Sequence, residues 1–193
     1  MKRCVMLLAL VLAAGCAHVD PVDSCVLVRC VDGHGSGCVI DDHLVLTAAH
    51  VAEDAVSVRL QDGTELPVLF AFFDPNEDAA VLFVLGDLPA PLPVSLERLN
   101  RGDEIVAIGA PWNSGMQGNM LFGRVVNLNI GMTYDPNDPN DNCFNDLLDV
   151  NMGPGISGGP VLRNGKVVGI MVGLTCGYGA MLPTASFKEL LER

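Results

Sequence analysis

One short segment of the 193-residue sequence places a serine where it could act as a nucleophile. In Gly155-Ile156-Ser157-Gly158-Gly159-Pro160 the serine lies among glycines, so its hydroxyl can project from a tight turn. The glycines also let a substrate carbonyl approach the backbone, where the N–H groups of Gly155 and Ser157 could stabilise one developing oxyanion. The flanking prolines have no N–H and cannot be donors. Alone, a glycine-rich turn is more often only a turn.

Two further segments could supply a base and an orienting acid. His50 follows the apolar run Leu44–Thr47, where a single histidine would by default be a buried core residue. With a nucleophile candidate elsewhere, an imidazole that titrates near neutrality becomes the natural acceptor for the serine proton. Asp78 heads the apolar run Ala79–Leu85 and would ordinarily be a solvated cap. Buried against the imidazole, it would instead fix the tautomer and stabilise the imidazolium.

The elements that must position these residues are predicted to be short strands. Apolar or alternating runs recur between turn signals, without the alternation of strands and helices that marks a parallel sheet. Asp62-Gly63 and Asn164-Gly165 are typical of hairpin turns, and Gly33–Gly37 is read as a turn. Gly86–Ser95, with three prolines, is expected to be an extended linker. Only residues 185–192 have a helical pattern, so the sequence predicts an all-β pair of barrels.

Composition and charge exclude several classes of partner. Half of the chain is apolar and 18% is charged, which is typical of a globular protein. Eleven Lys and Arg against 23 Asp and Glu give a net charge of −12. A nucleic acid or an anionic membrane surface would be repelled, so nucleic-acid binding is not expected, and membrane attachment would need an inserted group.

The N-terminus predicts such a group. A basic start is followed by the apolar run Cys4–Ala14, which is too short to span a bilayer and has the form of an export signal. Leu12-Ala13-Ala14-Gly15-Cys16 resembles a bacterial lipobox, which implies cleavage before Cys16 and diacylglycerol on its thiol. Residues 1–15 would then be a lipoprotein signal peptide and residues 16–24 a tether. The alternative is ordinary signal cleavage with Cys16 incidental.

Export favours disulfides among the five cysteines other than Cys4, in the signal peptide, and Cys16. We predict Cys30–Cys38, across a short hairpin, and Cys143–Cys176, between two loops of the second lobe. The sequence has no Cys-x-x-Cys pair, so a structural zinc site is not expected. The segment Asp135–Asn142 has spaced oxygen ligands that could hold calcium, but it lacks the pattern of an EF-hand loop, and a turn-forming loop is the favoured interpretation.

The order His50, Asp78, Ser157 resembles that of the trypsin-like serine proteases, and more closely their HtrA-type branch. Further similarity lies outside the three residues, in the same order as in the family. It comprises Gly35-Ser36-Gly37, the segment Gly102-Asp103-Glu104-Ile105-Val106-Ala107-Ile108-Gly109-Ala110-Pro111-Trp112, Gly123-Arg124-Val125-Val126, and Tyr178–Pro183 before a terminal helix.

The resemblance implies a chymotrypsin-like fold with two packed six-stranded β-barrels, at about residues 25–88 and 96–183, and a terminal helix at 184–193. It implies a serine endopeptidase that forms an acyl-enzyme without a metal or other cofactor. Its substrate would be a polypeptide, in unfolded or exposed proteins of the bacterial envelope, facing the periplasm or the exterior. Asn151, Val172 and Leu174 would line the primary pocket, and since none is acidic we expect small or medium apolar P1 residues.

Two departures from the family lead to further expectations. The sequence stops after the terminal helix, so we expect no PDZ domain. Ile156 stands before the nucleophile in place of the aspartate that pairs with a freed N-terminus in trypsin-like zymogens. We therefore expect loop ordering to set the active state, within Thr133–Asn151.

The sequence leaves two other classes of function open. One is a protease-fold pseudoenzyme that binds peptides without cleaving them, and the other is an envelope lipoprotein with a structural role. Capture by a serine-hydrolase probe separates the enzyme from both. The oligomeric state is also left open.

Overall fold

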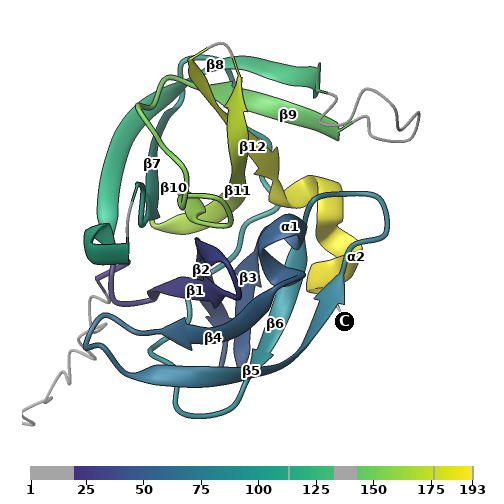
Figure 1. Ribbon diagram of the computed structural model, residues 1–193. Helices are drawn as coiled ribbons and strands as arrows, with labels where there is room; N and C mark the ends of the chain where they lie inside the picture. Colours follow the sequence, from purple (N-terminus) through teal and green to yellow (C-terminus); the bar gives the residue numbers. More distant parts are fainter. Residues whose placement is uncertain (1–19, 113, 133–142, 176, 193) are drawn as a thin grey trace, which may run out of the picture.

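The computed structural model describes residues 20–112, 114–132, 143–175 and 177–192. Two closed, six-stranded barrels of antiparallel strands make up this part of the chain (Figure 1). The strand orders are β1-β2-β3-β6-β5-β4 and β10-β11-β12-β9-β8-β7. The predicted all-β, chymotrypsin-like pair of barrels is confirmed.

The second strand of the first barrel begins earlier than the sequence pattern indicates. Gly33–Gly37, read as a turn, opens the long strand β2, whose register with β1 pairs Gly33 with Cys30. The glycines fit β2 into a crowded place, since a Cβ on Gly37 would lie 2.8 Å from Val45 Cγ1. A one-turn helix, α1 (Ala49–Ala52), also went unpredicted. The strands are β1 (Cys25–Cys30), β2 (Gly33–Asp41), β3 (Leu44–Thr47), β4 (Ala55–Arg59), β5 (Glu65–Phe73) and β6 (Ala80–Val84).

The second barrel follows the linker. The Asn164-Gly165 hairpin has φ of 52° and 74° at its two central residues, as a tight primed turn requires. One strand, β9, was not predicted, because its residues Cys143–Leu148 show no clear alternation. The strands are β7 (Glu104–Gly109), β8 (Asn119–Met132), β9 (Cys143–Leu148), β10 (Pro160–Arg163), β11 (Lys166–Thr175) and β12 (Tyr178–Pro183), with a 3-10 turn η1 (Ser114–Met116) between β7 and β8.

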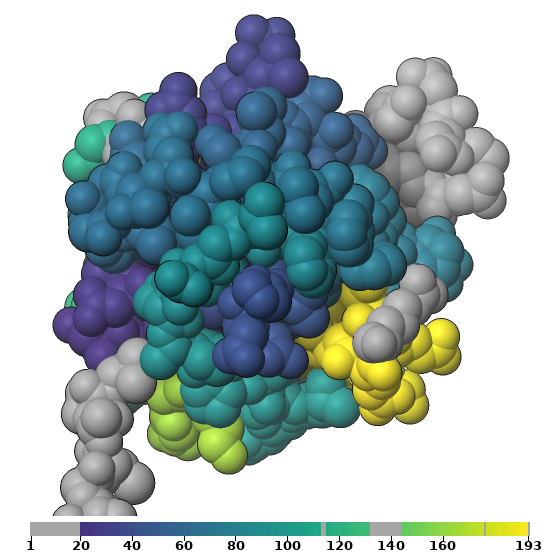
Figure 2. All heavy atoms as spheres, turned by 90° about the horizontal axis from the view of Figure 1, so that it is seen from below, coloured from purple at the N-terminus to yellow at the C-terminus, as the bar shows by residue number. Residues whose placement is uncertain are grey.

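The end of the chain returns to the first barrel. A 3-10 turn, η2 (Thr184–Phe187), leads into the one-turn helix α2 (Lys188–Leu191). In Figure 2, which views the molecule from below Figure 1, this yellow segment lies against the blue and teal residues of the first barrel. Leu190 is buried in the same cluster as residues of β3 and β6. The terminal segment therefore joins the two barrels.

The hydrophobic core also runs across both barrels. One buried cluster contains first-barrel residues such as Leu46 and Leu82 together with Ile170 and Leu182 of the second barrel. A separate cluster, including Leu148 and Met181, fills the second barrel. Because one core is shared, the loops of the two barrels that face each other are held in fixed relative positions.

One predicted disulfide is wrong. Cys30 lies opposite Gly33 at the end of the β1–β2 ladder, whereas Cys38 lies opposite Cys25. Cys38 is five residues beyond Gly33 on β2, or about 16 Å at about 3.3 Å per residue, which a disulfide cannot bridge. Cys25, Cys30 and Cys38 are free thiols. Cys16, Cys176 and the segment Asp135–Asn142 lie outside the described residues, so their predictions stay predictions.

Candidate active site

Two neighbouring strands bring His50 and Asp78 together. His50 lies in α1 just after β3, Asp78 lies just before β6, and the strands pair with Thr47 opposite Ala80. Asp78 Oδ1 accepts the His50 backbone N–H at 3.0 Å, and Asp78 Oδ2 lies 2.7 Å from His50 Nδ1. A carboxylate can only accept, so Nδ1 must carry the proton. The Nε2 atom of a neutral His50 is then left as the proton acceptor.

Opposing effects act on the pKa of His50. Burial lowers this pKa, while the hydrogen bond and charge of Asp78 and the charge of Glu53 raise it, and the net result is a raised pKa. The His50 side chain is 47% exposed and the Asp78 side chain 18%. The imidazole is therefore accessible as a base, and its partner carboxylate is largely shielded from water.

Ser157 belongs to the second barrel and lies in the turn that leads into β10. The turn packs on the first barrel through its backbone, because the Ser36 N–H of β2 donates to the Ser157 carbonyl at 2.8 Å. Gly158 has φ of 82°, and a Cβ there would clash with Thr47 Oγ1 and lie 2.9 Å from Ala48 N. Ser157 therefore lies beside the end of β3, from which α1 and His50 continue.

The described residues contain no hydrogen bond from Ser157 Oγ to His50. Catalytic hydrogen bonds are often long in a free enzyme and tighten only with substrate. The structure thus brings the serine turn and the His50–Asp78 pair together without a formed contact between nucleophile and base.

The backbone around Ser157 is constrained on both sides of Gly155. Gly155 has φ of 97°, a conformation that favours glycine, and a Cβ there would clash with His34 Nε2. The Pro154 carbonyl accepts the Trp112 N–H at 2.6 Å. In a trans peptide C=O and N–H point in opposite directions, so the Gly155 N–H points away from Trp112. Among the described residues, no group accepts the N–H of Gly155 or of Ser157.

The three residues predicted to line the primary pocket differ in their surroundings. Asn151 is exposed and Leu174 is 47% exposed. Val172 is 4% exposed and packs in the core cluster that joins the two barrels. The side chains of Asn151 and Leu174 are accessible to a ligand, and the pocket itself stays a prediction.

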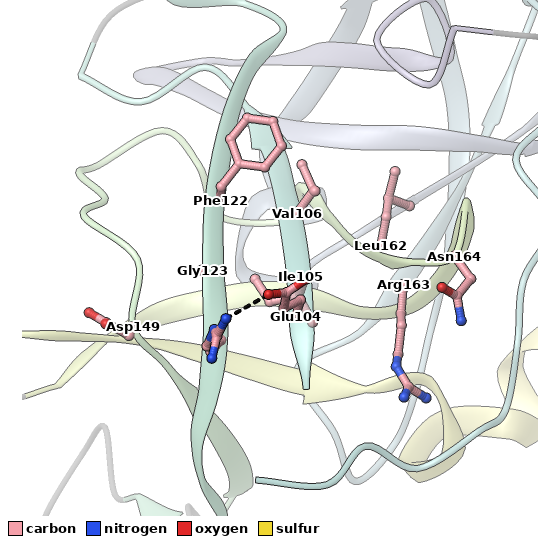
Figure 3. Close-up of a pocket in the computed structure, with 10 residues that line it drawn as sticks. Glu104, Ile105, Val106, Phe122, Gly123, Asp149, Leu162, Arg163 and Asn164 are labelled. Carbon is pink, nitrogen blue, oxygen red and sulfur yellow. Dashed lines mark hydrogen bonds and ion pairs between the residues drawn. The ribbon is translucent and has the colours of Figure 1, made fainter. Parts of the chain in front are cut away.

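A cavity of about 640 Å³ lies elsewhere, over β7, β8 and β10 (Figure 3). Phe122 and Leu162 line it, together with the ion pair between Arg124 and Glu104, whose charged atoms are 2.6 Å apart. None of the predicted site residues lines this cavity. It is therefore separate from the candidate active site.

Sequence reasoning missed the contribution of Ser36. The side chain is buried, and its hydroxyl donates to the Gly155 carbonyl at 2.8 Å. The available signals were its hydroxyl between two glycines, in a segment read as a turn, and the similarity of Gly35-Ser36-Gly37 to the family. Only the structure shows that this hydroxyl contacts the serine turn.

The described ranges contain no group of three or more His, Cys, Asp or Glu side chains that could hold a metal ion. Within these same ranges, no helix has the length and apolar character needed to cross a membrane.

Comparison with known proteins identifies the family. Residues 35–170 match the trypsin-like peptidase domain, and this match covers more than half of the chain. The matched segment includes His50, Asp78 and Ser157. The chain belongs to the trypsin-like peptidase family.

Relatives of the HtrA-type branch are similar in sequence. A "Probable periplasmic serine endoprotease DegP-like" of Pseudomonas putida (strain W619) is 38% identical over 142 residues, which are 70% of this chain and 28% of the relative. A protein of the same description from Chlamydia trachomatis serovar D is 31% identical over 172 residues, or 82% of this chain and 33% of the relative. The chain thus spans about a third or less of the length of these relatives.

Solved structures share the fold. The inactive form of the Rv3671c protease superposes with a TM-score of 0.76 and 25% identity, covering 89% of each chain. The active form of this protease, from M. tuberculosis, gives a TM-score of 0.77 and 24% identity, covering 89% of this chain and 81% of the other. The fold is therefore similar to both forms of that protease.

Proposed function

We propose that this chain is a serine endopeptidase in which His50, Asp78 and Ser157 form the catalytic triad. The observation that carries the proposal is the two-point contact of Asp78 with His50, at 3.0 and 2.7 Å, beside the serine turn. The unused N–H groups of Gly155 and Ser157 support it, because an oxyanion site needs donors that no protein group occupies.

The reaction follows from these positions. His50 Nε2 takes the Ser157 hydroxyl proton while Oγ attacks the scissile carbonyl. The negative charge on the carbonyl oxygen is stabilised by the N–H groups of Gly155 and Ser157. The imidazolium then protonates the leaving amine, which leaves an acyl-enzyme. Water, deprotonated by the same imidazole, releases the acyl group and restores Ser157.

Asp78 acts in this scheme through His50. It holds the Nδ1–H tautomer, and its charge stabilises the imidazolium that forms in each transition state. The raised pKa of His50 is the equilibrium sign of that stabilisation. The shielding of the carboxylate strengthens the effect, since water screens a buried pair less than an exposed one.

The proposed substrates are polypeptides with a small or medium apolar P1 residue. Asn151 and Leu174 are accessible, and neither would pair with a P1 Lys or Arg. Val172 is buried, so it would bound the site through its backbone rather than its side chain. A peptide library should show apolar P1 residues enriched in the cleaved products. A strong preference for Lys or Arg at P1 would contradict this specificity.

The proposed location is the bacterial envelope, with a lipid on Cys16. The lipobox-like sequence supports the anchor, and the periplasmic description of the relatives supports the compartment. Expression in a bacterial host should yield a protein that partitions into the detergent phase. A Cys16→Ser variant should partition into the aqueous phase, and equal partitioning of the two would overturn the anchor.

The direct test of the activity uses an unfolded protein as substrate. The full-length chain should cleave it, a Ser157→Ala variant should not, and Ser57→Ala, which removes a hydroxyl from β4 of the first barrel, should cleave at the parental rate. Folding of all three is checked by circular dichroism. If the folded parent binds the substrate without cleaving it, the peptide-binding alternative replaces the enzyme.

A further inference from the structure

Ser36 is a buried residue whose polar groups all contact segments near the proposed active site. It is 1% exposed and lies on β2 of the first barrel. Its N–H donates to the Ser157 carbonyl at 2.8 Å, and its carbonyl accepts the Thr47 hydroxyl at 2.7 Å. Its hydroxyl donates to the Gly155 carbonyl at 2.8 Å and accepts the Ala110 N–H at 2.9 Å.

The hydroxyl therefore joins two separate segments of the second barrel. Ala110 belongs to the segment that follows β7, and Gly155 belongs to the serine turn. The two segments approach closely at this point, since a Cβ on Gly109 would lie 2.7 Å from Ser36 Oγ. The Ser36 hydroxyl thus links the two segments, in addition to the backbone bond from the Trp112 N–H to the Pro154 carbonyl and a 3.0 Å contact of His34 Nε2 with the Ala110 carbonyl.

This connection controls the donor that the oxyanion site needs. Two residues beyond Ala110, the Trp112 N–H donates to the Pro154 carbonyl and so orients the Gly155 N–H. Trp112 has φ of 71°, a backbone conformation that a bulky residue keeps only when its surroundings enforce it. Its indole is 64% exposed and packs on Gly153, where a Cβ would clash with the ring. The anchor at Ala110 lies two residues before Trp112 and fixes the start of the segment that carries this conformation.

We propose that Ser36 is a positioning residue that holds the Gly155 N–H toward the substrate, by tying the Ala110–Trp112 segment to the serine turn. The proposal rests on the proposed function of Gly155 and Ser157. It also gives this chain a means of ordering the turn where Ile156 stands in place of an aspartate. The bridging group comes from the first barrel, and the turn that it orders belongs to the second.

The kinetic test compares the chain with its Ser36→Ala variant, and measures kcat and KM for cleavage of a peptide substrate. Loss of one oxyanion donor costs about 10²–10³-fold in kcat, and a donor that is only less well held should lose less, about 10–100-fold. KM should stay within about twofold, because the donors act on the transition state rather than on the bound ground state. Ser36→Cys, which keeps a weak donor of similar size, should lie between the parent and Ser36→Ala.

The matched control is Thr184→Val. The Thr184 hydroxyl is also buried and also bridges two segments, since it donates to the carbonyls of Ser95 and Val168 at 2.6 and 3.1 Å. Neither acceptor belongs to the serine turn or to the Ala110–Trp112 segment, so loss of this hydroxyl should lower the melting temperature but leave kcat within twofold. A purely structural role of Ser36 would give the two variants the same pattern.

A second readout does not depend on activity. Trp112 is the only tryptophan in the sequence, so the intrinsic emission of the protein reports on its segment. In folded Ser36→Ala, acrylamide should quench this emission more strongly than in the parent, and Thr184→Val should match the parent. Should Ser36→Ala fail to fold, Ser36→Cys carries both measurements.

The outcomes separate the two proposals. Absence of turnover in the folded parent contradicts the proposed function, and the quenching measurement still decides the role of Ser36. Turnover in the parent with unchanged kcat in folded Ser36→Ala overturns the role of Ser36 alone. Unchanged quenching in Ser36→Ala overturns it as well.

Two buried thiols carry an independent inference. Cys25 and Cys38 lie directly opposite each other on β1 and β2, and they are 2% and 0% exposed. The Val39 N–H donates to the Ser24 carbonyl at 2.9 Å, and the Cys25 N–H donates to Val22 rather than to Cys38. These bonds mark Cys25 and Cys38 as a non-hydrogen-bonded antiparallel pair. In such pairs the Cα atoms are about 4.5 Å apart, within the range of a disulfide.

We infer that Cys25 and Cys38 form a disulfide when the chain folds in the presence of a small-molecule disulfide. Each thiol loses a proton, the Cys25–Cys38 S–S bond forms, and the oxidant is reduced to two thiols. Burial raises the pKa of the Cys38 thiol to about 12, so the thiolate that starts the exchange is scarce in the folded barrel. The bond therefore forms before the barrel closes.

Peptide mapping after refolding in oxidised and reduced glutathione tests this pairing. Cleavage after Arg29 and before Asp32 places Cys25, Cys30 and Cys38 in three different peptides. The expected product links residues 23–29 to residues 32–40, and a Cys30→Ser variant should give the same product. Free thiols in both peptides, or a link from either to Cys30, would overturn the inference.

Discussion

The two barrels contribute to the candidate active site in different ways. The first barrel supplies His50 and Asp78, at the ends of two paired strands, where the Asp78 carboxylate contacts both the backbone N–H and the imidazole of His50. The second barrel supplies a turn that is held through its backbone carbonyls, by Ser36 and Trp112. Changes to the His50–Asp78 pair should therefore alter proton transfer and pH dependence. Changes to the serine turn should alter the positions of its N–H donors, with little effect on pH dependence.

The largest expected effect on turnover comes from removing the proposed nucleophile, Ser157, which lies between the contributions of the two barrels. Ser157→Ala should lower kcat by about 10⁶-fold, because triad members act as a unit and no other group can form the acyl-enzyme. Turnover of a peptide substrate measures the loss. Residual activity within about tenfold of the parent would show that another residue is the nucleophile.

Asp78→Asn should disrupt only the contribution of the first barrel, the His50–Asp78 pair. An amide cannot hold the Nδ1–H tautomer or stabilise the imidazolium, so kcat should fall by about 10⁴-fold. His50 must be neutral to act, and Asp78 raises its pKa despite burial. Without the carboxylate that pKa falls, and the acid limb of the pH–rate profile should move to lower pH.

The control for this variant is Asp42→Asn, an exposed aspartate in the turn between β2 and β3. It should leave both kcat and the acid limb unchanged. If the acid limb of the pH–rate profile of Asp78→Asn lies at the same pH as in the parent, His50 is not the titrating base.

Gly155→Ala should disrupt only the contribution of the second barrel, the serine turn. Its φ of 97° and the clash of a Cβ with His34 would displace the N–H donor, so kcat should fall by about 10²–10³-fold with an unmoved acid limb. Gly165→Ala is the matched control, since its φ is 74° but a Cβ there meets nothing within 4 Å. A similar loss of kcat in both variants would assign the effect to backbone strain in general.

The smallest effect on catalysis is expected from a core change in the second barrel. Leu148 is 0% exposed, so Leu148→Ala should lower the free energy of unfolding by about 2–5 kcal/mol. Leu148 shares its core cluster with Ile156 of the serine turn but supplies no polar group to the site, so the kcat of the folded fraction should stay within twofold. Chemical denaturation and turnover at low temperature measure the two quantities, and a large fall in kcat would mean that the core and the turn are coupled.

Local signals in the sequence predicted part of this fold well. Asp62-Gly63 and Asn164-Gly165 both form tight turns between paired strands, because those residues accept positive φ at little cost. The apolar run at Leu44–Thr47 became a strand within the same bounds. Such features depend on neighbours in the sequence, which is why they could be predicted.

Features that depend on distant partners could not be predicted. Gly33–Gly37 became a strand because β1 offered a partner, although five such residues ordinarily indicate a turn. The pairing of Cys38 with Cys25 rather than Cys30 follows from that same register. The contact of His50 with Asp78 was expected from the family order and is present, while the catalytic roles of these residues and of Ser157 stay predictions.

The central claim is that Ser157 is activated by the His50–Asp78 pair. A fluorophosphonate probe reacts with an activated serine, and mass spectrometry of the digested protein locates the modified residue. The account predicts one phosphonylated site, at Ser157, with labelling that is lost in His50→Ala although the serine is still present. Labelling at another serine, or equal labelling of Ser157 in folded His50→Ala, would contradict it.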